Sequence, residues 1–199
     1  HTNFTRNFDA VRDAGFRVIR RDLPGFGFSS KPDNVEYSMD YFNGKLIEFA
    51  DALELNQFSL IGNSLGGALS LGLSLNKPER IKKLILMGSG GIEDMETYNS
   101  MPGIQKLLSD FLGGEMNQEK IEGLLKLFPY DSSIITDEMI EDRMQILPLM
   151  NPQVLASMKI PNLEDDLGKI THPMLVFWGM DDKFCPVSGA SKIGQKCHD

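Results

Sequence analysis

The sequence predicts an α/β protein with a mainly parallel sheet flanked by helices and with a helical lid inserted between two strands. Short apolar segments of strand character alternate with longer segments whose apolar residues recur at helical spacing. Residues 92–168 contain helical patterns but no segment typical of a strand, and they are too many for a simple connection. We therefore expect a core in two parts, residues 1–91 and 169–199, with a lid at residues 92–168 between them.

Each element of the core has its own local signal. A helix should end at Gly15, because glycine suits the C-terminus of a helix. Pro24 followed by Gly25 suits a type II turn, so residues 22–27 should form a loop. The apolar run at residues 84–87 is typical of a strand buried on both faces. We expect strands at residues 16–20, 58–61, 81–87 and 174–178, and helices at residues 8–14, 40–53 and 65–75.

The composition disfavours several classes of partner. The 199 residues are 41% hydrophobic and 24% charged, which suits one globular domain with a sizeable core. The sequence has no run of about 18 apolar residues, so we expect no transmembrane helix. The formal net charge of −8 disfavours nucleic acid and anionic membranes as partners, because both require clustered Lys and Arg.

The two cysteines, Cys185 and Cys197, lack the spacing of metal ligands and are expected to be reduced and structural. Because there is no disulfide framework, a cytoplasmic location is favoured. The sequence also contains no ligand cluster for a metal and no glycine-rich loop for phosphates, so no metal or organic cofactor is expected.

The strongest chemical signal is the run Gly62-Asn63-Ser64-Leu65-Gly66, which matches the nucleophile elbow of serine hydrolases. It lies between an expected strand and an expected helix, which is the context that the motif requires. Ser64 is therefore the expected nucleophile. The N–H of Leu65, at the start of the helix, should donate to an oxyanion that forms beside Ser64. The alternative is an ordinary serine in a glycine-rich turn.

A serine nucleophile needs a base, and the base needs an acid that orients it. Asp181 and Asp182 follow the last expected strand, where a carboxylate can reach the elbow; the alternative is a solvated acidic turn. None of the three histidines is a convincing base. His172 lies at the wrong end of its strand, and His198 follows the acid without an intervening strand.

These motifs resemble those of the meta-cleavage product hydrolases, C–C bond hydrolases of aromatic hydrocarbon catabolism that have the α/β-hydrolase fold. Many α/β-hydrolases share the elbow and the acid loop. The features that discriminate better are Asn63, the pair Gly66-Gly67, and the lid segment 128–133 followed by Ile135, Thr136 and Arg143. The resemblance covers nearly the whole chain and is carried by residues 22–26, 62–68, 84–91, 128–133 and 178–186, and by Arg143.

The resemblance implies a substrate of the 2-hydroxy-6-oxo-hexa-2,4-dienoate type, which is first ketonised and then hydrolysed beside the C6 ketone. Ser64 would attack the ketone or assist water. Asp182, three residues after Gly179, would be the acid of the triad. Arg143 would bind the carboxylate or the 2-oxo group of the substrate, a task that suits its bidentate guanidinium. A solvated lid residue is the alternative for Arg143.

Further site residues also follow from the resemblance. Asn3 and Asn63 would be polar contacts of the substrate, although an Asn in a tight turn often only satisfies backbone groups. Phe128 and Trp178 would line an apolar pocket wall, with plain packing as the alternative. The family also implies a small-molecule substrate as the partner and allows a homo-oligomer.

The resemblance further implies that both ends of the fold lie outside these 199 residues. The oxyanion loop of the family should precede residue 1, and the catalytic His should follow Asp199. Without the strand that precedes the oxyanion loop, two sheet edges would be unpaired, so we expect the 199 residues alone neither to fold stably nor to turn over substrate. Two other functions stay open: a carboxylesterase or lactonase on the same fold, and a non-catalytic ligand-binding relative.

Overall fold

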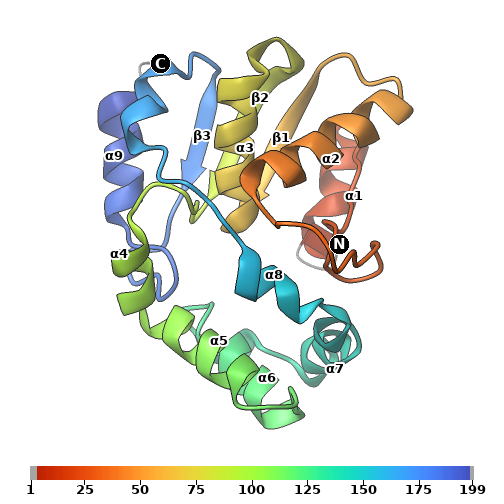
Figure 1. Cartoon of the computed structure of the whole chain (residues 1–199), viewed down its shortest axis with the longest axis vertical. Helices are drawn as coiled ribbons and strands as arrows, with labels where there is room; N and C mark the ends of the chain where they lie inside the picture. Colours follow the sequence, from red (N-terminus) through yellow and green to blue (C-terminus); the bar gives the residue numbers. More distant parts are fainter. Residues whose placement is uncertain (1–3, 198–199) are drawn as a thin grey trace.

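A computed structural model describes residues 4–197, which fold around a three-stranded parallel sheet with the order β1-β2-β3 (Figure 1). The strands are β1 (Phe58–Asn63), β2 (Ile81–Met87) and β3 (Met174–Phe177). Asn63 pairs with Met87, and Met87 pairs with Phe177. All three strands therefore end at the same edge of the sheet, which is where parallel α/β sheets place their functional loops.

The core helices α1 (Thr5–Asp13), α2 (Met39–Ala52) and α3 (Leu65–Asn76) lie where the sequence predicts helices. Helix α9 (Ser188–Lys196) follows the loop after β3. Helix α1 is followed by Gly15, which has a φ of 92°. Phe26 N donates to Leu23 O at 2.9 Å and Gly25 has a φ of 86°, so the expected type II turn is confirmed.

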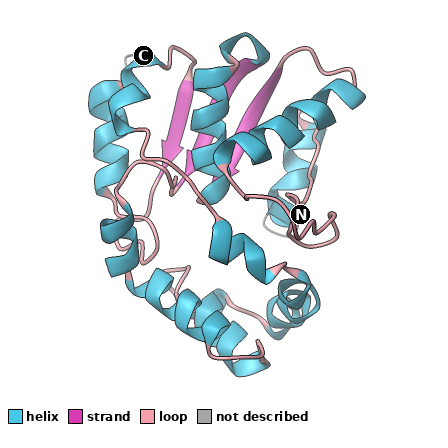
Figure 2. Cartoon of the chain, viewed as in Figure 1, coloured by secondary structure: helices cyan, strands magenta, loops and turns pink. Residues whose placement is uncertain are grey.

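Every regular element between β2 and β3 is helical, as expected for the lid (Figure 2). The strand arrows of Figure 2 point toward the side of the molecule on which α5 to α8 lie. Where the core ends and the lid begins stays a prediction. No helix within residues 4–197 combines the length and the apolar composition needed to span a bilayer. The lid helices are α4 (Met95–Ser100), α5 (Pro102–Leu112), α6 (Gln118–Leu125), α7 (Asp137–Ile146) and α8 (Pro152–Ser157), with 3₁₀ turns at Ser132–Ile134, Leu147–Leu149 and Glu164–Lys169.

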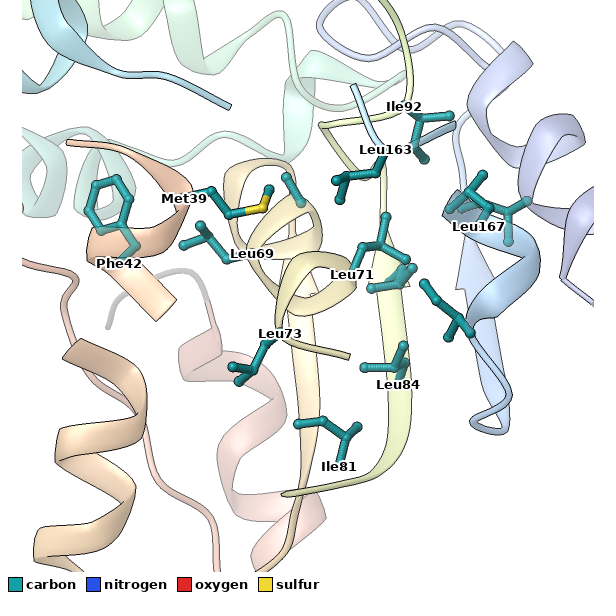
Figure 3. Packing of buried hydrophobic residues seen from close by; sticks show 14 of the residues in the cluster. Met39, Phe42, Leu69, Leu71, Leu73, Ile81, Leu84, Ile92, Leu163 and Leu167 are labelled. Carbon is teal, nitrogen blue, oxygen red and sulfur yellow. The ribbon is translucent and has the colours of Figure 1, made fainter. Parts of the chain in front are cut away.

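The main hydrophobic core surrounds α3, whose residues 67–74 are all buried. Figure 3 shows Leu69, Leu71 and Leu73 of this helix among side chains from the sheet, from α2 and from the returning end of the lid. Burial of these large apolar side chains is the dominant stabilising contribution. Because α3 begins at Leu65, this packing also anchors the residue before it, Ser64.

The structure corrects one expected strand. Residues 16–20 form no strand, and the side chain of Phe16 is 65% exposed. A strand is stabilised by hydrogen bonds to a neighbouring strand, and within residues 4–197 the sheet begins at β1. The local preference of Val18 and Ile19 for extended backbone is therefore not sufficient to form a strand.

The two faces of the sheet differ in burial. On β2, Leu84 and Leu86 are buried in the core, whereas the alternating Ile85 and Met87 are only half-buried. Apolar side chains on the same face of the neighbouring strands, such as Ile61, Leu175 and Phe177, are 40–52% exposed. The expectation that β2 is buried on both faces is thus met on one face only.

Candidate active site

Ser64 occupies a strained turn between β1 and α3. Its φ of 51° and ψ of −113° lie in a region that residues with a side chain rarely adopt. The backbone is held there by two hydrogen bonds, from Ser64 N to Met87 O at 3.1 Å and from Gly90 N to Ser64 O at 2.9 Å. Both partners belong to β2 or to the loop after it, so the end of β2 fixes the turn.

Glycines allow this turn to be tight. A Cβ atom on Gly62 would overlap the carbonyl group of Gly66, and a Cβ atom on Gly67 would overlap the side chain of the buried Ser89. Leu65 is the first residue of α3, and the first N–H groups of a helix have no acceptor within it. The turn therefore has the geometry of a nucleophile elbow, with the Leu65 N–H beside Ser64.

The loop after β3 places a carboxylate at the same edge of the sheet. Asp182 Oδ1 accepts hydrogen bonds from the N–H groups of Phe184, at 2.8 Å, and Cys185, at 2.9 Å. A Cβ atom on Gly88, the first residue after β2, would lie 2.9 Å from Asp182 Oδ2. Asp182 thus faces the end of β2, as Ser64 does, whereas the neighbouring Asp181 is exposed.

A buried thiol lies between the serine and the acid. Burial raises the pKa of Cys185 to about 12, and the charge of Asp182 adds to this effect. A hydrogen bond with the side chain of Ser64 acts in the opposite direction. These interactions place Ser64, Asp182 and Cys185 in one cluster. The sequence predicts only a structural role for Cys185, because nothing in its spacing signals contact with the nucleophile.

Comparison with known proteins agrees with this geometry. The family described as the alpha/beta hydrolase fold matches residues 1–116. A 2-hydroxy-6-oxononadienedioate/2-hydroxy-6-oxononatrienedioate hydrolase of Comamonas testosteroni is 35% identical, over 96% of this chain and 70% of the relative. A 2-hydroxy-6-oxo-6-phenylhexa-2,4-dienoate hydrolase of Burkholderia cepacia has the same identity and coverage. The solved meta-cleavage product hydrolase of Pseudomonas fluorescens IP01 superposes with a TM-score of 0.82, at 26% identity, over 99% of this chain and 73% of that one.

The chain belongs to the α/β-hydrolase fold family, among the meta-cleavage product hydrolases. In this hydrolase the described part of the chain contains one histidine, His172, and it lies before β3, at the opposite end of the strands from Ser64. His172 Nε2 lies 2.9 Å from Pro78 O. As expected, His172 is not placed to serve as the base. His1 and His198 lie outside the described residues.

Two expected pocket residues of the hydrolase are engaged in packing. The indole Nε1 of Trp178 donates to Cys185 O at 2.9 Å, and the ring closes over Gly189. The ring of Phe128, from the lid, stacks on Phe184 with centroids 4.4 Å apart and the planes at 7°. Phe128 therefore joins the lid to the loop that holds Asp182, although its side chain is 61% exposed. Lining of a substrate pocket by either residue stays a prediction.

The polar residues that are expected to contact the substrate differ in their surroundings. Asn63 Nδ2 donates to Met87 O at 3.0 Å, so this amide braces the ends of β1 and β2. Arg143, on α7, is half-buried, and burial lowers the pKa of its guanidinium from the ordinary value. Asn3 lies outside the described residues. Substrate contacts of these three residues stay predictions.

Two hollows in the described surface lie away from the serine. One of about 320 Å³ lies beside Met39, Gly72 and Leu163, and another of about 360 Å³ lies beside Arg21 and Phe49. Neither is lined by Ser64 or Asp182. The strained serine, and not either hollow, marks the candidate site, because a nucleophile is identified by its geometry. Within residues 4–197, no group of three or more His, Cys, Asp or Glu side chains is arranged to hold a metal ion.

Proposed function

We propose that this chain is part of a serine-dependent hydrolase that cleaves a C–C bond in 2-hydroxy-6-oxo-hexa-2,4-dienoate-type products of aromatic meta-cleavage. One observation carries the proposal. A serine in strained backbone at the start of a helix shares a sheet edge with a loop-bound carboxylate, in a chain that is 35% identical to hydrolases named for such dienoates. The chemistry of that substrate class suits this arrangement.

The reaction starts with ketonisation of the dienol, which moves a proton to C5 and leaves ketones at C2 and C6. Ser64 Oγ then adds to the C6 ketone, and the resulting oxyanion is stabilised by the N–H of Leu65. When the C5–C6 bond breaks, its electron pair moves through the C3=C4 double bond onto the C2 oxygen. Water releases the acyl group from Ser64 as a carboxylic acid, and the other product is a 2-hydroxy-dienoate.

Asp182 supports this chemistry through its geometry. Two backbone N–H groups hold one carboxylate oxygen, so the second oxygen, on the side of Gly88, can orient an imidazole. Arg143 provides a positive charge that can bind the carboxylate end of the substrate. Even with its pKa lowered by burial it stays protonated at neutral pH, and a guanidinium binds a carboxylate or an α-keto acid bidentately.

Loss of the dienoate's visible absorbance tests the proposal, with the protein expressed from its full reading frame and Ser64→Ala as the comparison. We expect rapid loss that Ser64→Ala slows by about 10³-fold or more. Inert dienoate together with Ser64-dependent cleavage of aryl esters would instead identify an esterase. Binding of dienoate without turnover of either compound would identify a ligand-binding relative.

We also propose that the protein functions in the cytoplasm. Cys185 and Cys197 are free thiols in the structure, and reduced thiols are typical of that compartment. Fractionation of the source cells, with the chain detected by an antibody, tests this assignment.

A further inference from the structure

Lys192 of α9 forms ion pairs with two glutamates that are far apart in the sequence. Its Nζ lies 2.6 Å from Glu93 Oε2 and 2.8 Å from Glu164 Oε2. Glu93 belongs to the segment that leaves β2 for the lid, and Glu164 opens the 3₁₀ turn through which the chain returns from the lid to β3. We call these three residues the Lys192 bridge. We call the segment that contains Glu93 and the one that contains Glu164 the hinge segments of the lid. The side chain of Lys192 thus binds both hinge segments to α9.

The bridge is partly shielded from water. The side chain of Glu93 is 8% exposed, and those of Lys192 and Glu164 are 28% and 27% exposed. Both carboxylate oxygens of Glu93 have partners on α9, since Ser188 Oγ donates to Oε1 at 2.6 Å. The hydrogen bonds that Lys192 donates to Glu164 and Glu93 raise its pKa, so its ammonium group is charged at neutral pH. Removing one partner of such a buried pair leaves an uncompensated charge.

Backbone contacts beside the bridge join the same two hinge segments. Leu163 N donates to Gly91 O at 2.8 Å, so the outgoing and returning chains are hydrogen-bonded one residue before Glu164. The hydroxyl of Tyr98, on α4, accepts hydrogen bonds from the N–H groups of Ile92 and Glu93. The backbone of Glu93 is thereby held from the lid side, and its carboxylate is held from α9.

The helix that carries Lys192 is also the helix that follows the acid loop. Helix α9 begins at Ser188, six residues after Asp182, and Gly189 packs under the ring of Trp178. The lid reaches the same loop independently, because Gly103 N donates to Lys183 O at 2.8 Å. Helix α9 and the lid thus both contact the loop of Asp182, so the way α9 binds the hinge segments bears on how the lid sits over that loop.

We infer that Lys192 is a positioning residue, which sets the lid over the Ser64 edge of the sheet by binding Glu93 and Glu164 together. The inference rests on the proposed function only for its effect on catalysis. Lid residues such as Arg143 would bind the substrate in the ground state and in the transition state alike. A loosened lid should therefore raise KM more than it lowers kcat.

Two variants separate the bridge from general stability. Glu164→Gln leaves the Glu93–Lys192 pair intact and removes the charge that Lys192 and Lys196 both pair with, which weakens the hold of α9 on the returning hinge segment. The double variant Glu93→Gln/Lys192→Met removes both charges of the more buried pair, so that neither is left unpaired. Lys169→Met is the matched control, because Lys169 ends the same 3₁₀ turn but pairs with Asp166 alone among residues 4–197, and its side chain is 73% exposed.

The measurements are amide hydrogen exchange along the chain and dienoate kinetics, both on protein from the full reading frame. We expect exchange at residues 92–163 to be about tenfold faster in both bridge variants and unchanged in the control. KM should rise about tenfold, with kcat within about threefold of the parent value.

Faster exchange confined to residues 164–169 and 188–196, with KM unchanged, would overturn the inference and leave a local stabilising contact. Unchanged exchange throughout would overturn it as well. If dienoate is not a substrate, the proposed function fails, but the exchange pattern still decides whether Lys192 positions the lid.

Discussion

Gly62 and Gly66 approach each other so closely that a side chain on Gly62 would overlap the carbonyl oxygen of Gly66. The contact brings the end of β1 against the first turn of α3, and Ser64 lies between them in left-handed backbone. The strain at Ser64 is therefore maintained by close packing of backbone on backbone, which the buried remainder of α3 holds in place.

Gly62→Ala should destabilise the protein by about 2 kcal/mol or more, because the added methyl group meets backbone atoms that cannot move aside. Gly66→Ala is the control. A Cβ atom there meets nothing within 4 Å, so the helix preference of alanine should change the stability by less than about 1 kcal/mol. Urea unfolding of both variants measures the difference. Equal midpoints for Gly62→Ala and the parent would show that the elbow is less tightly packed than described.

Replacing Asp182 by Asn and by Ala separates its structural role from its catalytic one. Asn keeps an oxygen that can accept from the N–H groups of Phe184 and Cys185, so the stability should change by less than about 0.5 kcal/mol. Asp182→Ala should cost about 1–3 kcal/mol, because those N–H groups lose their acceptor. Both variants should lose about 10²–10⁴-fold in kcat, since neither can balance a protonated imidazole. Full activity of Asp182→Asn would show that another residue is the acid of the triad.

The Cys185 thiol should resist alkylation in the folded protein. Burial raises its pKa from the ordinary 9.0 to about 12, so at pH 9 the folded thiol is almost entirely protonated. In a Cys197→Ser background, iodoacetamide should label Cys185 at least about 100-fold more slowly in the folded protein than in urea. Rapid labelling of the folded protein would place the thiol at the surface.

The same raised pKa predicts a dependence of stability on pH. A thiol whose folded pKa exceeds its unfolded pKa stabilises the folded state fully below pH 9, and this contribution is lost as the pH rises toward about 12. Unfolding midpoints should therefore fall more steeply between pH 9 and pH 11 for the parent than for Cys185→Ala. If the midpoints of the parent and of Cys185→Ala fall equally with pH, the pKa of Cys185 is not raised in the folded protein.

Arg143→Met should discriminate between a dienoate hydrolase and a general esterase. Loss of a charged hydrogen-bonding partner should reduce kcat/KM for dienoate about 10–100-fold, equivalent to about 1.5–3 kcal/mol. Turnover of a neutral aryl ester should stay within about threefold, because that substrate has no carboxylate for Arg143. Lys126→Met is the control, since Lys126 is a more exposed lid cation paired with Glu122. An equal loss on both substrates would indicate a structural role for Arg143.

Local sequence signals predicted the elements that depend on local chemistry. Gly15 after α1 and Gly25 in its type II turn have the conformations that glycine favours. The alternation of apolar strands and amphipathic helices likewise predicted the parallel sheet, since both patterns are set by which face of an element is buried. The strand predicted at residues 16–20 is absent, because a strand also requires a neighbouring strand to hydrogen-bond with, which local preference does not supply.

The sequence by itself determined the fold class, the elbow at Ser64, and the loop that holds Asp182, because glycine, proline and apolar periodicity act over a few residues. Only the tertiary structure decided which side chains meet across long separations. In the folded chain Cys185 contacts Ser64, Phe128 stacks on Phe184, and Lys192 pairs with both Glu93 and Glu164. Such contacts depend on how whole elements pack, and a single sequence contains no local signal for that packing.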